Sequence, residues 1–135
     1  MLKKAPWLQL TSDFSIAVHE ALPADWPSAA APGDACFHVF QSREFLTAWL
    51  ASRGQCAKTN CYFVEINNRL GERVMLLPLA ITRVGGVRVL GFVDGGLADY
   101  GAPIIYPHRT CWSKGLVAAL WDAVVEQLPR VDLVK

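Results

Sequence analysis

The sequence predicts an α/β or α+β fold: a mixed, mostly antiparallel sheet of five or six strands with two main helices packed against it. Three observations predict this fold. Residues 42–53 and 110–128 carry apolar side chains at helical spacing, and strand-like runs separated by turn residues fill residues 62–106. The chain also has 135 residues, 53% of them hydrophobic, which is enough for one domain with its own core.

The first predicted helix covers residues 42–53. Ser42 suits the N-cap, Glu44 suits the positive end of the helix dipole, and Gly54 suits a C-terminal stop. Between them lies one apolar stripe, formed by Phe45, Leu46, Trp49 and Leu50.

The second predicted helix covers residues 110–128, with Thr110 as its cap and Pro129 as its stop. Its apolar residues surround most of the helix and leave a narrow polar strip around Asp122 and Glu126. A surface helix needs an apolar stripe of only about 100°. We therefore expect this helix to be covered on two sides.

The remaining predicted elements are strands. They cover residues 14–20, 62–66, 73–84, 87–93, 102–106 and 131–135. Gly85 and Gly86 suit a tight hairpin turn, and residues 67–72 supply a second turn. Pro78 lacks a backbone N–H, so we expect it at a bulge or where a neighbouring strand ends. Residues 22–34, rich in proline, are expected to be mainly a connecting loop.

Charge and hydropathy exclude several classes of function. The net charge of +1 gives no general attraction to nucleic acid or to an anionic membrane. No run approaches the roughly 18 apolar residues of a membrane span. The start, Met1-Leu2-Lys3-Lys4, is basic like a signal peptide, but Pro6 and the polar residues after it break the apolar run. The expected location is the cytoplasm.

The cysteines do not predict a metal site. Cys36-x-His38 and Cys56-x4-Cys61 match metal-ligand spacing only loosely, and no second ligand pair follows at the distance of a zinc finger. In a cytoplasmic protein they are expected to be free thiols, mostly buried.

Asp99 and Tyr100 are the candidate site residues. They follow a glycine-rich loop, where an acid and a phenol can supply a general base and a hydrogen-bond donor at the end of a sheet. The alternative is structural: Asp99 caps the loop and Tyr100 packs with its hydroxyl hydrogen-bonded. No Gly-x-Ser-x-Gly motif of a hydrolase is present, and Gly85-Gly86 suits a hairpin better than a phosphate cradle.

Three motifs in order carry a family resemblance. They are Phe-Gln-Ser-Arg-Glu-Phe-Leu-Thr-Ala-Trp at residues 40–49, Leu77-Pro78-Leu79, and Ala-Asp-Tyr-Gly-Ala-Pro at residues 98–103. From about residue 14 to residue 135 the chain resembles the N-terminal half of the CelD/BcsL-type (BioF-like) acyltransferases. These belong to the Gcn5-related N-acetyltransferase (GNAT) superfamily, beside the FemABX peptidyltransferases.

The resemblance implies a tandem enzyme. Residues 1–12 would be an N-terminal tail, and residues 13–135 the first of two GNAT-like domains, with acetyl-CoA or another acyl-CoA held mainly by the second. The family transfers acyl groups to amines and is linked to exopolysaccharide or cellulose production. The implied partners are the second domain, or a partner chain, and a small-molecule amine acceptor.

One family motif is missing. The Gln/Arg-x-x-Gly-x-Gly/Ala loop that binds the CoA diphosphate does not occur in this chain. The resemblance therefore assigns no cofactor-binding or catalytic residue here, and only Asp99 and Tyr100 match a motif that borders the substrate cleft. We expect this chain to be a truncated domain that neither binds acyl-CoA nor transfers acyl groups alone.

Two alternatives remain. The first is a non-catalytic interaction module or homodimer-forming domain, favoured by the high apolar content and by the broadly apolar second helix. The second is a complete small acyltransferase with an unusual cofactor loop at Gly85-Gly86, which would bind acetyl-CoA unaided.

Overall fold

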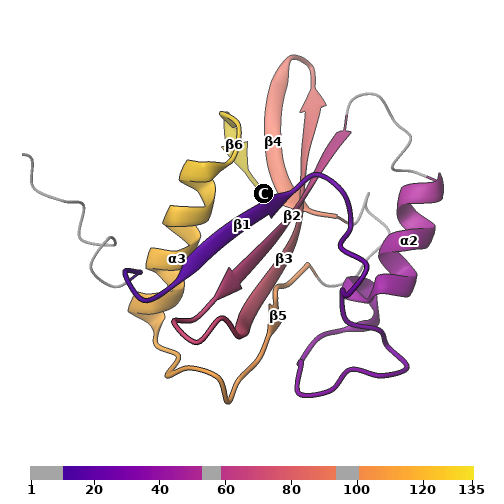
Figure 1. The fold of residues 1–135 in the computed structure, drawn as a ribbon. Coiled ribbons are helices and arrows are strands. Elements are labelled where there is room, and N and C mark those ends of the chain that lie inside the picture. The colour runs from indigo at the N-terminus through magenta and orange to yellow at the C-terminus, as the bar shows by residue number, and fades with distance from the viewer. Residues whose placement is uncertain (1–10, 53–58, 94–100) are drawn as a thin grey trace, which may run out of the picture.

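The computed structural model describes residues 11–52, 59–93 and 101–135, and these form one sheet with a helix on each face (Figure 1). The sheet contains β1 (Ser15–His19), β2 (Thr59–Asn67), β3 (Arg73–Val84), β4 (Val87–Phe92), β5 (Ile104–Ile105) and β6 (Leu133–Val134). A 3-10 turn, η1 (Val39–Gln41), leads into the helix α2 (Arg43–Ser52), and α3 (Lys114–Gln127) precedes β6. The predicted mixed, mostly antiparallel fold is confirmed.

The strands follow the order β1-β2-β3-β4-β6, and β5 pairs with β3. All pairs are antiparallel except β4 with β6, which run parallel. Parallel neighbours need a crossover connection, because the chain must return to the starting end of the sheet. The segment that contains α3 makes this crossover.

Pro78 lies at a break in the ladder of β3. One edge of β3 pairs with β2, whereas the other edge pairs with β4 from Leu79 onward and with β5 at Met75 and Leu76. The Pro78 carbonyl accepts a hydrogen bond from the Val93 amide at 2.9 Å. The N and O of one strand residue face the same neighbour, so the missing N–H of proline falls between β4 and β5. The predicted placement at the end of a neighbouring strand is confirmed.

The side chains of β3 alternate between two hydrophobic cores. Met75, Leu77, Leu79 and Ile81 belong to one core together with residues of α3, whereas Leu76 and Ala80 belong to the other together with residues of α2. The contributions of the helices to these cores are Leu116, Leu120 and Val124 from α3 and Leu46 and Trp49 from α2. Both faces of β3 are buried, which explains its unbroken apolar sequence.

The helix starts agree with the sequence at α2 but not at α3. Ser42 caps α2, since its Oγ accepts a hydrogen bond from the Phe45 amide at 3.2 Å. The prediction of Thr110 as the cap of the second helix is wrong: Ser113 Oγ accepts from the Leu116 amide at 3.1 Å, and the helix starts at Lys114. Leu116 is the first buried residue of α3, and only Ser113 stands three residues before it, where a capping hydroxyl reaches the backbone.

Replacing Ser113 with alanine is expected to lower the free energy of unfolding by about 1 kcal/mol, because the cap of α3 is lost. The matched control is Thr110→Ala, for which a change below about 0.5 kcal/mol is expected. Urea denaturation followed by circular dichroism measures both. Equal losses in the two variants would contradict the assignment of the cap to Ser113.

The sheet covers one side of α3, as predicted, but the expected second cover is not found in the described part of the chain. On the side away from the sheet, Val117 keeps 42% of its surface exposed and Trp121 is only partly buried. No helix within the described ranges combines the length and the apolar character needed to cross a membrane.

Candidate functional site

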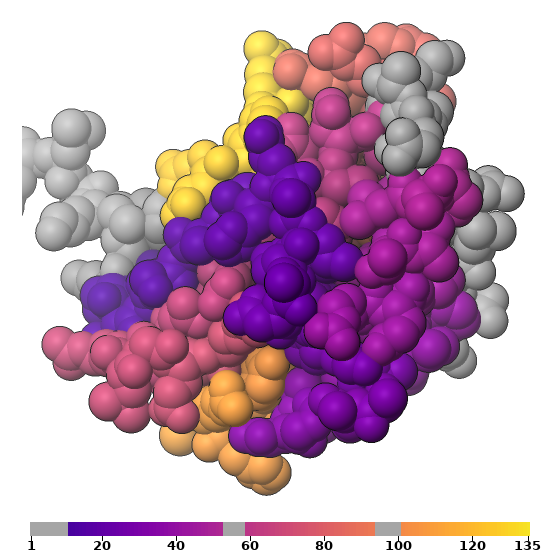
Figure 2. All heavy atoms as spheres, turned by 45° about the vertical axis from the view of Figure 1, so that its right-hand side comes forward, coloured from indigo at the N-terminus to yellow at the C-terminus, as the bar shows by residue number. Residues whose placement is uncertain are grey.

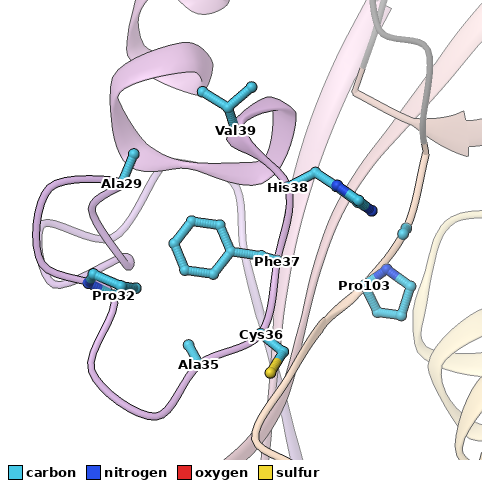
Figure 3. Close-up of a pocket in the computed structure, with 9 residues that line it drawn as sticks. Ala29, Pro32, Ala35, Cys36, Phe37, His38, Val39 and Pro103 are labelled. Carbon is cyan, nitrogen blue, oxygen red and sulfur yellow. The ribbon is translucent and has the colours of Figure 1, made fainter.

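A pocket of about 680 Å³ lies between the loop before α2 and the segment that enters β5 (Figure 3). One wall comes from residues 29–39 and the other from Ala102 and Pro103. The lining residues are Ala29, Pro32, Ala35, Cys36, Phe37, His38, Val39, Ala102 and Pro103.

A backbone bridge fixes the distance between the two walls. The Cys36 amide donates to the Ile105 carbonyl at 2.7 Å, and the Ile105 amide donates to the Cys36 carbonyl at 3.1 Å. Ile105 is in turn paired with Met75 of β3, so the sheet positions both walls. Figure 2 shows the two segments, purple and orange, in contact at the lower part of the molecule.

Trp26 fastens the loop before α2 to the sheet. Its side chain is 1% exposed, its ring packs edge-to-face on Phe63 of β2 at 5.6 Å, and its Nε1–H donates to the Gln41 carbonyl at 2.8 Å. Arg43 adds two contacts at the start of α2: its Nη1 donates to the Ala24 carbonyl and its amide to the Pro27 carbonyl. The loop that builds most of the pocket is therefore held against both β2 and α2.

Glu44 holds the loop from the first turn of α2. Its carboxylate accepts hydrogen bonds from the Ser28 hydroxyl and, at 2.9 Å, from the amide of Ala29, a lining residue of the pocket. The Ser28 hydrogen bond, followed by that of the Ala29 amide, lowers the pKa of Glu44 to about 2. The ionised carboxylate is thus part of the local structure of this wall.

Replacing Ser28 with alanine is expected to raise the pKa of Glu44 from about 2 toward its usual range, since the hydroxyl makes the largest contribution to the shift. NMR titration of the Glu44 carboxyl carbon measures the change. Ser52→Ala is the matched control, because the Ser52 hydroxyl donates to backbone carbonyls at the other end of α2. An unaltered titration of Glu44 in Ser28→Ala would contradict this account.

A cluster of charged side chains holds the loop before α2 against the sheet at a second place. Arg73 of β3 donates to Glu65 of β2 at 3.0 Å, forms an ion pair with Asp25 at 2.7 Å, and donates to the Asp25 carbonyl. His19 Nε2 lies 3.4 Å from the same Glu65 carboxylate. The loop residue Asp25 is thereby bound to the central strands.

The Glu65 and Asp25 carboxyls both have lowered pKa values. Burial acts to raise the pKa of Glu65, but the hydrogen bond and the charge of Arg73 outweigh it and hold that pKa below its usual value. For Asp25 the Arg73 hydrogen bond is the largest cause of the decrease in pKa. Both groups therefore favour the ionised state in the folded protein.

Arg109 links the far end of the same loop to the sheet. Its guanidinium donates to the Asp34 carboxylate at 3.1 Å and to the Arg73 carbonyl at 3.1 Å, and it stacks on the Tyr106 ring at 4.2 Å. Asp34 directly precedes Ala35, where the pocket wall continues. The pocket is thus framed by fixed contacts on both sides of its main loop.

The lining of the pocket is mostly apolar. Cys36 and His38 carry its reactive side chains, and Figure 3 shows the His38 ring extending from its wall toward the opposite wall at Pro103. The lining residues include no lysine, arginine or carboxylate. Such a pocket suits a small, uncharged or weakly polar group rather than a phosphate.

The described residues contain no cluster of three or more histidine, cysteine, aspartate or glutamate side chains that could hold a metal ion. Cys36 and His38 share the pocket, but they supply only two such groups. In the described part of the chain Cys36, Cys61 and Cys111 are free thiols, as predicted, but Cys36 and Cys111 are exposed and Cys61 is only partly buried, so the prediction that most are buried is wrong for these three. Burial raises the pKa of Cys61 to about 11.

The predicted site residues Asp99 and Tyr100 lie outside the described residues. The end of their motif is described: Ala102 and Pro103 line the pocket, and Gly101 passes close to Phe92 of β4. A Cβ added at Gly101 would come within 3.1 Å of the Phe92 ring. The sequence did not indicate that residues 29–39 form the other wall, and its only signal there was the Cys36-x-His38 spacing.

The fold and the pocket define a mixed α/β protein with a ligand-sized pocket beside its sheet. Comparison of the chain with family models, with curated proteins and with solved structures gave no match.

Proposed function

We propose that this chain is the N-terminal, substrate-side half of a GNAT-type N-acyltransferase. In this proposal an amine acceptor occupies the pocket, and a second domain holds the acyl-CoA. One observation carries the proposal: the motif of residues 98–103 supplies two lining residues of the pocket, and the opposite wall runs directly into the motif of residues 40–49. Val39 of one wall leads directly into the motif of residues 40–49, and Ala102 and Pro103 of the other wall end the motif of residues 98–103.

The chemistry of the pocket supports the acceptor rather than the cofactor as its occupant. A CoA diphosphate is bound by cationic side chains or by a series of backbone N–H groups at a helix N-terminus. The lining residues include neither lysine nor arginine, and the chain lacks the diphosphate-binding motif. An apolar pocket with one imidazole suits the smaller substrate, whose amine must lose a proton during the reaction.

The reaction is a direct acyl transfer. The amine nitrogen attacks the thioester carbonyl, a C–N bond forms, the C–S bond breaks, and CoA leaves as the thiolate. The pocket would position the amine, and His38 would accept its proton, which finally neutralises the thiolate. Imidazole suits this task because it exchanges protons readily near neutral pH. Backbone N–H groups of the complete enzyme would stabilise the oxyanion.

Titration of the chain with amines and with acetyl-CoA tests the proposal. We expect weakly basic amines that are wholly or partly uncharged near neutral pH, such as aniline, 2-aminopyridine and glucosamine, to shift the amide NMR signals of Ala35, His38 and Ala102, and acetyl-CoA to shift none. His38→Asn should weaken amine binding, whereas His108→Asn, at an exposed histidine that does not line the pocket, should not. Failure of all three amines to bind would overturn the proposal. Binding of acetyl-CoA by the chain alone would instead favour a complete small acyltransferase.

A further inference from the structure

The outer side of α3 carries a narrow surface whose residues are arranged symmetrically along the helix. A groove of about 530 Å³ runs along it, lined by Trp112, Ser113, Lys114, Val117, Ala118 and Trp121. In Figure 1, α3 lies at the outside of the molecule with the sheet on its other side. The buried residues of the helix, such as Leu116 and Leu120, face the sheet, so the groove belongs to the opposite face.

The residues along this face are arranged symmetrically about Ala118. Lys114 stands four residues before Ala118 and Asp122 stands four residues after it. Residues four apart lie on the same face of a helix, so the stripe begins with a positive charge, has a small residue at its centre, and ends with a negative charge. Both charged residues are exposed, and in the described part of the chain neither takes part in an ion pair.

The aromatic and glycine residues follow the same symmetry. Trp121 lies three residues after Ala118, and Gly115 lies three residues before it. A Cβ added at Gly115 would meet no atom within 4 Å, so the surface above Gly115 is open. An antiparallel copy of the helix, centred on the same alanine, places Trp121 of one chain over Gly115 of the other.

We propose that two copies of this chain associate through antiparallel packing of α3 on α3, across a twofold axis at Ala118. In this arrangement Lys114 of each chain faces Asp122 of the other, and two ion pairs form. A parallel arrangement would place like charges together. The small side chain of Ala118 allows the helices to approach to the roughly 8 Å of close helix packing. The apolar surfaces of Val117 and Trp121, which the described part of a single chain leaves exposed, are then buried between the two helices.

Charge reversal tests the register of this interface. Sedimentation equilibrium of the whole chain at low salt should give a mass near twice 14.9 kDa. Lys114→Asp or Asp122→Lys alone replaces two ion pairs by two like-charge contacts, and each should raise the dimer dissociation constant about tenfold. The double variant Lys114→Asp/Asp122→Lys rebuilds both pairs with exchanged signs and should restore the dissociation constant.

The controls separate this interface from loss of folding and from other surfaces. Arg83→Glu reverses an exposed charge at the β3–β4 hairpin, away from the stripe on α3, and should leave dimerisation unchanged. Ala118→Trp should block the close approach and give monomers whose circular dichroism is unaltered. A chain that stays monomeric up to about 0.5 mM would overturn the proposal, because a specific interface of this kind forms well below that concentration. The proposal would also be overturned if the single charge reversals left the dissociation constant of the dimer unchanged, or if the double variant did not restore it.

Discussion

Replacing Trp26 with alanine is expected to lower the free energy of unfolding by about 3–5 kcal/mol, the usual loss for a large buried aromatic side chain. Trp26 is 1% exposed, and its ring packs on Phe63 while its indole binds the Gln41 carbonyl. Its removal leaves a cavity between the loop and β2 and an acceptor without its donor. Denaturant unfolding followed by circular dichroism measures the loss.

The variant Trp26→Phe separates packing from hydrogen bonding. It retains an aromatic ring against Phe63 but removes the donor to Gln41, so we expect a loss smaller than that of the alanine variant. Because Trp26 holds the loop that carries one pocket wall, the alanine variant should also change the amide NMR signals of Ala35 and His38. A loss below 1 kcal/mol in Trp26→Ala would contradict the proposed anchoring role.

Replacing Arg73 with methionine is expected to lower the free energy of unfolding at neutral pH by about 3 kcal/mol. The Glu65 carboxylate, with 18% of its side chain exposed, would lose the guanidinium that binds it at 3.0 Å. The carboxylate would keep only His19, at 3.4 Å, and a mostly buried charge that loses its guanidinium destabilises the folded state more than an exposed one. Chemical denaturation at pH 7 measures this effect.

The pH dependence of the Arg73 variant follows from the directions of the pKa shifts. Glu65 and Asp25 have lowered pKa values in the folded wild type, so their contribution to stability is present above the pKa of the unfolded chain. This contribution to stability is lost as the pH falls through the pKa values of the two carboxyls in the folded state. The difference in stability between wild type and Arg73→Met should therefore be largest above about pH 5 and should narrow toward pH 3.

A second substitution provides the control for this network. Glu65→Gln combined with Arg73→Met removes the charge that the single variant leaves without its guanidinium, so part of the lost stability should return at pH 7. The Asp25 side chain is 74% exposed, so water solvates it without Arg73. If Arg73→Met were equally destabilising at pH 3 and pH 7, the role assigned to the ionised Glu65 would be wrong.

The sequence predicted the sheet and both helices because their signals are local. Alternation of apolar residues marks strands, the Gly85-Gly86 pair marks the hairpin, and both glycines have positive φ angles in the structure, 57° and 82°. Pro78 was placed correctly because its missing N–H restricts it to a break in pairing. Element ends were less accurate: β5 has two residues where five were predicted, and β2 begins three residues early, at Thr59.

The pocket was not predicted because its construction is non-local. No pattern within residues 29–39 indicates that Cys36 will pair with Ile105, since a single bridge between irregular segments has no periodicity. The choice between Thr110 and Ser113 as a cap depends on where α3 meets the sheet, which is also a tertiary property. Asp99 and Tyr100 stay a prediction, and Ala102 and Pro103, from the same motif, line the pocket.

The position of β3 has a consequence for how the protein unfolds. Met75, Leu77, Leu79 and Ile81 belong to the core under α3, and Leu76 and Ala80 belong to the core beside α2. If either helix separates from the sheet, one face of β3 becomes exposed to water. The other face of β3 still packs against the remaining helix and its core. Local opening of one helix therefore lowers the stability of the whole sheet. We expect both helices and the sheet to unfold in a single cooperative transition, because β3 contributes residues to both hydrophobic cores.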